Sequence, residues 1–404
     1  VSGNSSSSGG GAYYGILNNC TVSGNSAKYY GGGAYYGTLN NCIVYYNSAP
    51  NGSNYYNSTF NYSCTTPRPA GPGNMDAEPQ LASTSHLSAQ SPCIGAGNSA
   101  YSRGVDIDGE NWLKPPCMGA DQFVAGQVTG ALTVAITAAY TNVSTGFEVA
   151  FVGDIRGRVS ASVWDFGDGV VVSNRPCASH AWAAPGVYEV RLTGYNESYP
   201  GGVSTSVWVR VEAREVYYVN GANAAPAHPY TNWASAATRI QEAIDAGQQM
   251  GRLVLVADGV YGSGGRAVYG QMTNRVVVPE GVEVRSVNGP LRTVIEGRAG
   301  AGGGNGDGAI RCVYVGPNAV LSGFTLTNGH TRADGDYDKE RSGGGVWCEP
   351  SGVVSNCTVS GNSACWYGGG ASYGTLNHCT VSGNSADYGG GAYKGTLNNC
   401  IVSS

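Results

Sequence analysis

The feature that most constrains the fold is a phrase of 21 or 22 residues that recurs near both ends of the chain. Three copies are NNCTVSGNSAKYYGGGAYYGTL at 18–39, SNCTVSGNSACWYGGGASYGTL at 355–376 and NHCTVSGNSADYGGGAYKGTL at 377–397. Short apolar alternations are separated by Gly and Asn turns, and a repeat of this length predicts one coil of a solenoid. The phrase lacks the several leucines and the helical segment of leucine-rich repeats. We therefore predict an all-β fold in which these coils form a right-handed parallel β-helix.

Stacked coils would place equivalent residues in ladders about 4.8 Å apart. We predict inward ladders of valine and leucine, formed by Val22, Val44, Val359, Val381 and Val402 and by Leu17, Leu39, Leu376 and Leu397. The repeated cysteines are interpreted as buried thiols, because Cys is among the most buried residue types. Disulfides between coils are the alternative, although side chains in register on parallel strands suit bridge geometry poorly. The repeated tyrosine position (Tyr13, Tyr35, Tyr393) predicts either self-packing or a stripe that stacks on sugars.

Residues 64–123 lose the repeat and are rich in proline. The motifs SPCIGAGN, GVDIDGENW and PPCMGADQF in this stretch resemble the closing segment of secreted β-helix proteins. Cys93 and Cys117 are candidates for a disulfide here. Asp106 and Asp108 could bind Ca²⁺ or could simply form a turn.

Residues 127–213 carry alternating strands and the motifs VWDFGDG (163–169) and HAWAAPGVYEV (180–190). WDFGDG followed by H-x-W-x-x-P-G-x-Y-x-V closely resembles a PKD domain, an immunoglobulin-like β-sandwich common in exported bacterial proteins. The resemblance implies that Trp164 and Tyr188 are core aromatics and that Asp165 and Asp168 fix the turn between two strands. Such domains serve as spacers or as contacts to sugars and proteins.

The segment after residue 214 leads into increasingly regular coils and resembles the start of bacterial right-handed β-helix proteins, where a short helix covers the first coil. Trp233, Ala237, Ile240 and Ile244 lie at helical spacing behind Thr231 and Asn232, which predicts an amphipathic helix. We therefore divide the chain into three parts: 1–123, the second half and closing segment of a β-helix; 124–213, a PKD-like sandwich; and 214–404, a capping helix and the first half of a β-helix.

The repeated phrase is interrupted at both termini, and bare coil edges are templates for pairing with another chain. We expect a head-to-tail homopolymer, with closure within one chain as the alternative. The predicted assembly interface comprises Val1, Asn4, Leu17, Cys20, Leu397, Cys400 and Val402. The coils resemble the repeats of polymorphic outer-membrane proteins and adhesins. This resemblance implies a structural filament or adhesive fibre, outside or on the surface of a bacterial cell, that contacts surface glycans.

A secreted polysaccharide lyase or glycosidase is the enzymatic alternative, and a glycan-binding module is a third. An enzyme needs clustered acids, for catalysis or around Ca²⁺. The densest acidic stretch is ADGDYDKE, so Asp334, Asp336 and Asp338 form a Ca²⁺ candidate, with His330 nearby. The regular coils otherwise carry almost no carboxylates, and we expect no enzymatic activity and no other cofactor.

The remaining features exclude several classes of partner. The formal net charge of −5 and the absence of a basic stripe disfavour nucleic acid, and no apolar run is long enough for a membrane span. Sequons for N-glycosylation occur at Asn4, Asn19, Asn51, Asn57, Asn61, Asn142, Asn196 and Asn356. A chain so rich in Asn, Ser and Thr produces many such matches by chance.

Overall fold

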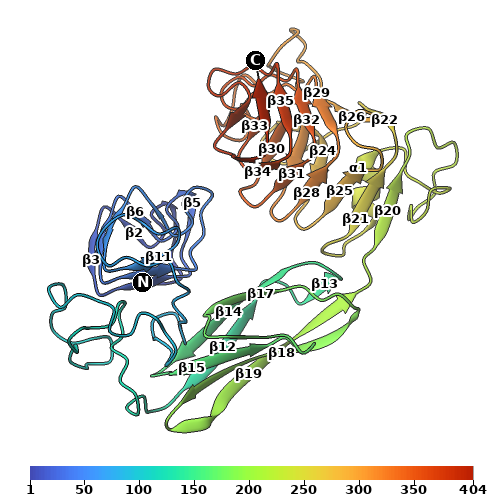
Figure 1. The fold of residues 1–404 in the computed structure, drawn as a ribbon. Helices are drawn as coiled ribbons and strands as arrows, with labels where there is room; N and C mark the ends of the chain where they lie inside the picture. The colour runs from blue at the N-terminus through green and yellow to red at the C-terminus, as the bar shows by residue number, and fades with distance from the viewer. Residues whose placement is uncertain (404) are drawn as a thin grey trace. The chain divides into compact units, whose positions relative to one another are not determined.

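The computed structural model describes residues 1–403 (Figure 1), and it divides into two compact units. The N-terminal unit is Val1–Glu212, and the C-terminal unit begins at Ala213. Each unit is described by itself below. The strands far outnumber the helices, since one α-helix, α1 (Ile240–Ala246), occurs among the described residues.

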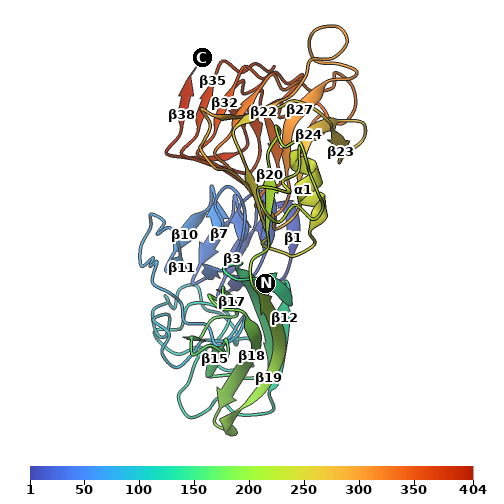
Figure 2. The same cartoon turned by 90° about the vertical axis from the view of Figure 1, so that its right-hand side faces the viewer.

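The C-terminal unit is a stack of coils, visible in Figure 2 as successive layers of yellow to red strands. Its strands form three sheets that the chain visits in turn, one strand per coil. The first sheet contains β20 (Val216–Val219), β21 (Leu253–Val256), β25 (Glu283–Ser286), β28 (Val320–Ser322), β31 (Val353–Ser355), β34 (Thr375–Asn377) and β37 (Thr396–Asn398). The second contains β22 (Gly259–Tyr261), β26 (Thr293–Glu296), β29 (Thr325–Thr327), β32 (Thr358–Ser360), β35 (Thr380–Ser382) and β38 (Ile401–Ser403). The third contains β23 (Arg266–Ala267), β24 (Thr273–Val278), β27 (Ile310–Val315), β30 (Val346–Cys348), β33 (Ala371–Ser372) and β36 (Ala392–Tyr393).

All neighbouring strands in these sheets are parallel except the β23–β24 pair. The register places Val359, Val381 and Val402 on one line and Leu376 beside Leu397 on another, as the ladders predicted. Val359 and Val381 are fully buried. The interior of the coil is therefore built from aliphatic ladders, because β-branched and leucine side chains fill a pleated, inward-facing surface well.

The helix α1 covers the first coils, but it is shorter than the periodicity predicted. Ile240, Ala243 and Ile244 face the core. Trp233 was expected on the same helical face, yet it lies outside the helix and is 43% exposed. The reason is local: Asn232 Oδ1 accepts the N–H of Ser235 at 3.0 Å in a turn, and Ala237 pairs with Val219 of β20 as a bridge.

The N-terminal unit begins with a second stack of coils. Its parallel strands are β1 (Ser5–Ser8), β2 (Ala12–Tyr13), β3 (Ile16–Asn18), β4 (Thr21–Ser23), β5 (Ser26–Tyr30), β6 (Ala34–Tyr35), β7 (Thr38–Asn40), β8 (Ile43–Tyr45), β9 (Tyr55–Tyr56), β10 (Thr59–Asn61) and β11 (Cys64–Thr65). Residues 66–123 then form an irregular closing segment, whose Leu81, Leu87 and Met118 share one core with Ile43 and Cys64 of the coils.

An antiparallel sandwich follows within the same unit. One sheet contains β12 (Thr133–Ala138), β14 (Val149–Arg156) and β17 (Cys177–His180); the other contains β13 (Asn142–Ser144), β19 (Tyr199–Glu212), β18 (Gly186–Asn196), β15 (Ala161–Asp165) and β16 (Val171–Ser173). Trp164 is fully buried as expected, whereas Tyr188 is half-buried and stacks on buried Trp182, with 5.4 Å between ring centroids. Asp165 accepts the N–H of Gly167, which fixes the predicted turn.

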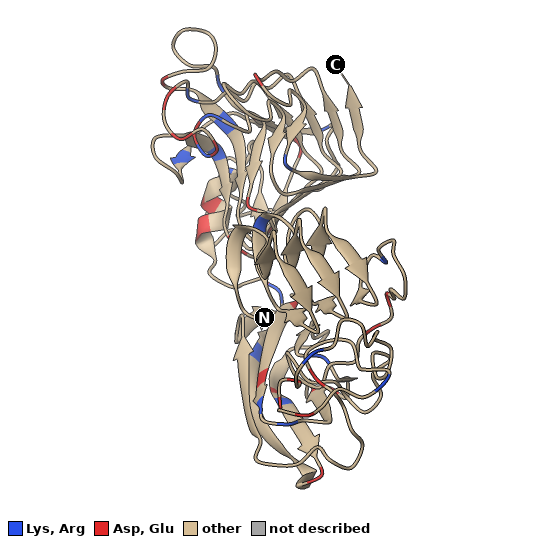
Figure 3. Ribbon diagram, turned by 90° about the vertical axis from the view of Figure 1, so that its left-hand side faces the viewer, with Lys and Arg blue, Asp and Glu red and all other residues tan. Residues whose placement is uncertain are grey.

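The predicted fold class is confirmed: the chain is nearly all β, with parallel strands before and after the sandwich in the sequence. Figure 3 shows that charged residues gather in loops, on α1 and on the sandwich, while most coil strands carry none. Charge in a coil interior would be costly, because a buried ion loses its hydration.

Candidate functional site

The outermost coil of the C-terminal unit presents the ladder residues to solvent. Its strands β36, β37 and β38 each form the edge of one of the three sheets. Val402 is 53% exposed and Ile401 65% exposed, although Val381 directly beneath Val402 is fully buried. Leu397 is 37% exposed, and the thiol of Cys400 donates to the carbonyl of Leu376 at 3.3 Å. The edge is therefore a largely apolar surface.

The first coil of the N-terminal unit has the same character. Val1 is 53% exposed, and Leu17 and Cys20 are half-buried. Asn4 is exposed, and its Nδ2 donates to Oδ1 of Asn25 at 3.0 Å. All seven residues of the predicted interface thus lie on the outermost coils of their units.

An asparagine ladder hydrogen-bonds neighbouring coils to each other in both units. Asn25 Nδ2 donates to Asn47 Oδ1 at 3.0 Å in the N-terminal unit. Asn362 Nδ2 donates to Asn384 Oδ1 at 2.9 Å in the C-terminal unit. Asn362 and Asn25 are each 1% exposed, so these amides satisfy backbone and side-chain groups inside the turn.

The cysteine ladders are chains of thiols. All twelve cysteines are unbridged, including Cys93 and Cys117, which were candidates for a disulfide and are both buried in the core of the closing segment. The hydrogen bond with the Cys42 thiol lowers the pKa of Cys20 to about 7, while burial raises that of Cys42. The hydrogen bond with Cys357 likewise lowers the pKa of Cys379 to about 7.

The loop proposed for Ca²⁺ does not gather its three carboxylates. Asp334 and Asp336 are exposed, and Asp336 Oδ1 accepts the backbone N–H groups of Asp338 and Lys339 at 3.0 and 2.8 Å. Asp338 Oδ1 accepts the hydroxyl of Tyr373 at 2.8 Å. These carboxylates cap a turn and fasten it to the coil. His330 packs against the coil nearby, and burial lowers its pKa.

Three other carboxylates do converge, in the closing segment. Oxygens of Asp106, Asp108 and Asp121 lie within 4.8 Å of one another, the one such group found over residues 1–403. The sequence indicated Asp106 and Asp108 but not Asp121, which belongs to the later motif GADQF. Asp106 is already engaged, because it accepts N–H groups from Asp108 and Glu110 on Oδ1 and from Gln122 on Oδ2 at 2.7–3.0 Å.

Cationic side chains neutralise the rest of this acidic cluster. Asp108 Oδ2 lies 3.2 Å from Nε of Arg158 in the sandwich, and His86 Nε2 lies 3.4 Å from Asp108. Arg158 also pairs with Glu110. The cluster therefore joins the closing segment to the sandwich. Its carboxylate oxygens already accept hydrogen bonds and ion pairs from the protein, so they are not available to bind a cation.

The acidic cluster predicts a pH-dependent N-terminal unit. Burial raises the pKa of Asp121 to about 6. Burial alone would lower the pKa of His86, but Asp108, Asp121 and Asp106 raise it overall. Asp121 and His86 both bind a proton more tightly in the folded protein than in the unfolded chain. Their contribution to the free energy of unfolding is therefore present at low pH and is lost as the pH rises through their folded pKa values. The hydrogen bond from His86 lowers the pKa of Asp108, whose stabilisation is lost only in acid, below its unfolded value.

We therefore expect the melting temperature of the N-terminal unit to fall between pH 5 and pH 8, measured by calorimetry. Asp121→Asn, which mimics the protonated acid, should raise the melting temperature at pH 8 and flatten this dependence. The control is Asp154→Asn, in an exposed ion pair with Arg156. A melting temperature independent of pH, or a D121N variant less stable than wild type at pH 8, would contradict the assignment.

The glycosylation candidates differ in accessibility. Asn4, Asn57, Asn142 and Asn356 are exposed, whereas Asn19, Asn51 and Asn61 are half-buried. Asn196 is 3% exposed, and its Nδ2 donates to the carbonyls of Gly130 and Arg158. Its amide is thus committed to the interior of the sandwich, which is incompatible with carrying a glycan in the folded state.

The tyrosine stripe packs on itself. Tyr13 lies against Tyr35 with ring centroids 5.4 Å apart and planes 50° apart, and Tyr393 stacks on Tyr367 at 3.9 Å. These rings contact one another along the stack of coils. Sugar stacking along the stripe is therefore disfavoured, although Tyr13 and Tyr14 in the first coil are 58% and 65% exposed.

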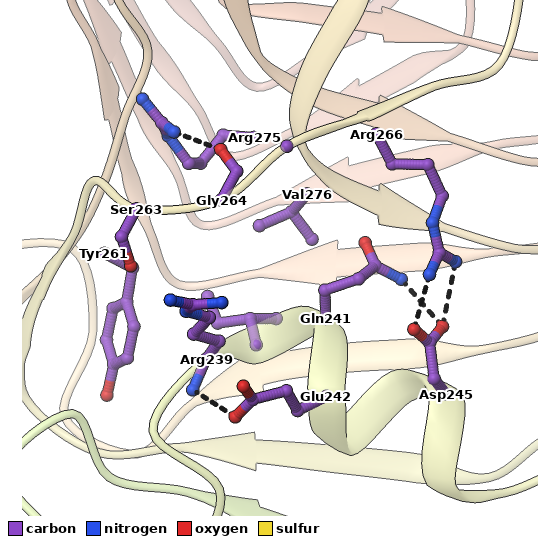
Figure 4. Close-up of a pocket in the computed structure, with 12 residues that line it drawn as sticks. Arg239, Gln241, Glu242, Asp245, Tyr261, Ser263, Gly264, Arg266, Arg275 and Val276 are labelled. Carbon is purple, nitrogen blue, oxygen red and sulfur yellow. Dashed lines mark hydrogen bonds and ion pairs between the residues drawn. The ribbon is translucent and has the colours of Figure 1, made fainter.

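A hollow of about 230 Å³ beside α1 is lined by charged groups that fasten the helix (Figure 4). Arg266 pairs with Asp245 through two bonds of 2.9 and 2.6 Å. Arg275 donates to the carbonyl of Glu296 at 2.8 Å, and the Gln241 side chain accepts the N–H of Val277 at 2.9 Å. The bonds of Asp245 and Gln241 tie the helix to the coil, whereas the bond of Arg275 joins two strands of the coil itself.

Comparison with known proteins identifies one part of the chain. Residues 131–208 match the family model of the PKD domain, which agrees with the sandwich and its WDFGDG turn. Comparison with curated proteins gives no match. Among residues 1–403, no helix has the length and apolar character needed to cross a membrane.

Proposed function

We propose that this protein is a structural segment of an extracellular or cell-surface bacterial filament or adhesive fibre. In this proposal the last β-helix coil of one protein molecule is continued end to end by the first coil of the next molecule. The PKD domain is a spacer between the two stacks of coils within each molecule. PKD domains are typical of extracellular proteins, which supports the location.

The observation that carries the proposal is the equivalence of the two exposed coil edges. Ala12–Tyr13, Leu17–Asn18 and Val1–Ser2 in the N-terminal unit have the same residues as Ala392–Tyr393, Leu397–Asn398 and Val402–Ser403, and Val1–Ser2 cover Val22–Ser23 as Val402–Ser403 cover Val381–Ser382. Within each unit these residues pair in register with copies of themselves, such as Leu17 with Leu39 and Val381 with Val402. If the two edges met, identical residues would therefore pair in register across the junction, as they already do between neighbouring coils within each unit.

Burial supplies the driving force for this pairing. Val1 and Val402 are each 53% exposed at the edges, although Val22 and Val381, their counterparts one coil further in, are fully buried. Covering apolar side chains is worth roughly 25 cal/mol per Å². The stacked tyrosines and the asparagine amides would extend across the junction in the same way, which adds direction to the contact.

The enzymatic alternative depends on acids that the fold already uses. Asp106, Asp108 and Asp121 are held by backbone amides, His86 and Arg158. In the acidic loop, Asp336 caps a turn and Asp338 accepts the hydroxyl of Tyr373. A lyase or glycosidase needs carboxylates presented to a substrate. The geometry therefore favours the structural role.

The test is the association state of the full chain, measured by sedimentation velocity and electron microscopy over a range of concentrations. We expect end-to-end association, and loss of it in Leu397→Lys and Val402→Lys, because a charge at these inward-facing positions would have to be buried at the junction. Leu291→Lys is the control, since Leu291 is 94% exposed and lies away from the edge. A wild-type chain that stays monomeric, or edge variants that associate normally, would refute the proposal.

A further inference from the structure

A shallow hollow of about 350 Å³ lies on one corner of the first coils of the C-terminal unit. It is lined by Asn220, Trp233, Ala257, Asp258, Val287 and Asn288. None of the functions above uses these residues. The hollow combines an exposed indole with amide and carboxylate groups.

The coil geometry places the three polar groups at one corner of the coils. Asn220, Asp258 and Asn288 follow the ends of β20, β21 and β25, which are consecutive strands of one sheet. Backbone bonds of 2.9 Å continue the pairing into these turns, from Ala257 N to Val219 O and from Val287 N to Val256 O. Asp258 and Asn288 thus occupy equivalent positions on two successive coils, about 4.8 Å apart, whereas Asn220 is in register with Ala257 and lies one residue earlier on the coil before them.

A hydrogen bond fixes two of the polar groups relative to each other. Asn288 Nδ2 donates to Asp258 Oδ1 at 2.9 Å. The second oxygen of Asp258 and the amide oxygen of Asn288 are left to accept hydrogen bonds from a ligand. A carboxylate and an amide held side by side can together receive and donate bonds to adjacent hydroxyl groups.

Trp233 provides an apolar wall beside this pair. Its indole is 43% exposed and rests edge-on against Tyr218, with ring centroids 4.7 Å apart. The surrounding loop is anchored to the coil, because Asn223 Nδ2 donates to the carbonyls of Ala236 and Ala234 at 2.7 and 3.2 Å. The ring is therefore held in place while one part of it stays open to solvent.

We propose that this corner is a binding site for a neutral pyranose ring of a glycan. A pyranose has an apolar C–H face that suits an indole and a rim of hydroxyls that suits Asp258, Asn288 and Asn220. No lysine or arginine lines the hollow, and its one charged group is a carboxylate, so a sulfated or uronic sugar is disfavoured. The site would give the proposed fibre a contact to surface glycans, yet its chemistry does not depend on assembly.

The proposed glycan site and the assembly edge lie at opposite ends of the stack of coils in the C-terminal unit. The glycan site sits on the first three strands of the sheet β20-β21-β25-β28-β31-β34-β37, and the exposed edge is the seventh. A chain carrying Val402→Lys should therefore bind sugar like wild type. Failure of glycan binding and failure of assembly can be distinguished in this way.

The experiment is a screen of the full chain against an array of neutral and anionic glycans, followed by calorimetric titration with the best neutral oligosaccharide. We expect Trp233→Ala and Asp258→Asn to weaken binding by about tenfold or more, because each removes one wall of the site. The matched control is Trp208→Ala, since Trp208 is 58% exposed on the sandwich and does not line this hollow. Unchanged circular dichroism and melting temperature would show that the variants fold.

Three results would overturn the proposal. The first is no binding to any neutral glycan, and the second is equal loss of binding in the Trp208 and Trp233 variants. The third is binding of tetramethylammonium at Trp233 without sugar binding, because an indole beside a carboxylate also suits an organic cation.

Discussion

Replacing Val381 by aspartate is expected to unfold or strongly destabilise the coils of the C-terminal unit. Val381 is fully buried between Val359 and Val402 of the adjoining coils, in a ladder that contains no group able to pair with a carboxylate. An uncompensated buried charge costs roughly 3–5 kcal/mol. In a unit of this size that loss corresponds to a fall in melting temperature on the order of 10 °C.

The matched control for this experiment is Val260→Asp. Val260 lies on β22 of the same unit and is 67% exposed, so its substitution should change stability by less than about 0.5 kcal/mol. Thermal unfolding of both variants, followed by circular dichroism, tests the inward orientation of the valine ladder. If V381D melted like wild type, the ladder would not be the core of the coil.

The Val381 ladder could be predicted because its signal is periodic. Equivalent residues recur at 21 or 22 positions, and only stacking in register brings each of them onto its own copy. The turns between strands could also be predicted, because these turns require positive φ values that Gly and Asn adopt readily. Asn356 has φ 51° and Gly361 has φ 65°. Repetition thus carries both the strand register and the turn chemistry.

Contacts between non-repeated segments could not be read in the same way. Asp121 approaches Asp106 only after the closing segment folds back, and His86 and Arg158 come from segments 20 or more residues away from Asp108. Trp233 has the spacing of a helical residue, yet the turn at Asn232 and the bridge from Ala237 to Val219 override that pattern. Such sites depend on which distant loops come into contact in the folded protein. Without a repeat, the local sequence of each loop does not indicate its partner.

Arg311 shows how a coil can bury charge, and its replacement by methionine is the other change with a large expected effect. The guanidinium is 1% exposed and donates to the carbonyls of Gly343, Lys339 and Ser342 and to Asn274 Oδ1 at 2.6–2.9 Å. Burial lowers its pKa to about 9. Methionine preserves much of the volume but leaves these acceptors without donors, each at a cost of about 1–3 kcal/mol.

We expect Arg311→Met to lower the stability of the C-terminal unit by roughly 2–4 kcal/mol, because relief of the arginine's desolvation offsets part of the lost bonding. Hydrogen exchange should report the loss first in residues 337–343, the loop that Arg311 holds against the coil. Arg298→Met is the control, since Arg298 is exposed and its guanidinium donates only to the Gly308 carbonyl, at 3.2 Å. An R311M variant as stable as wild type, with unchanged exchange in the loop, would mean that the hydrogen bonds from Trp347 and Tyr373 to Asp338 suffice to hold it.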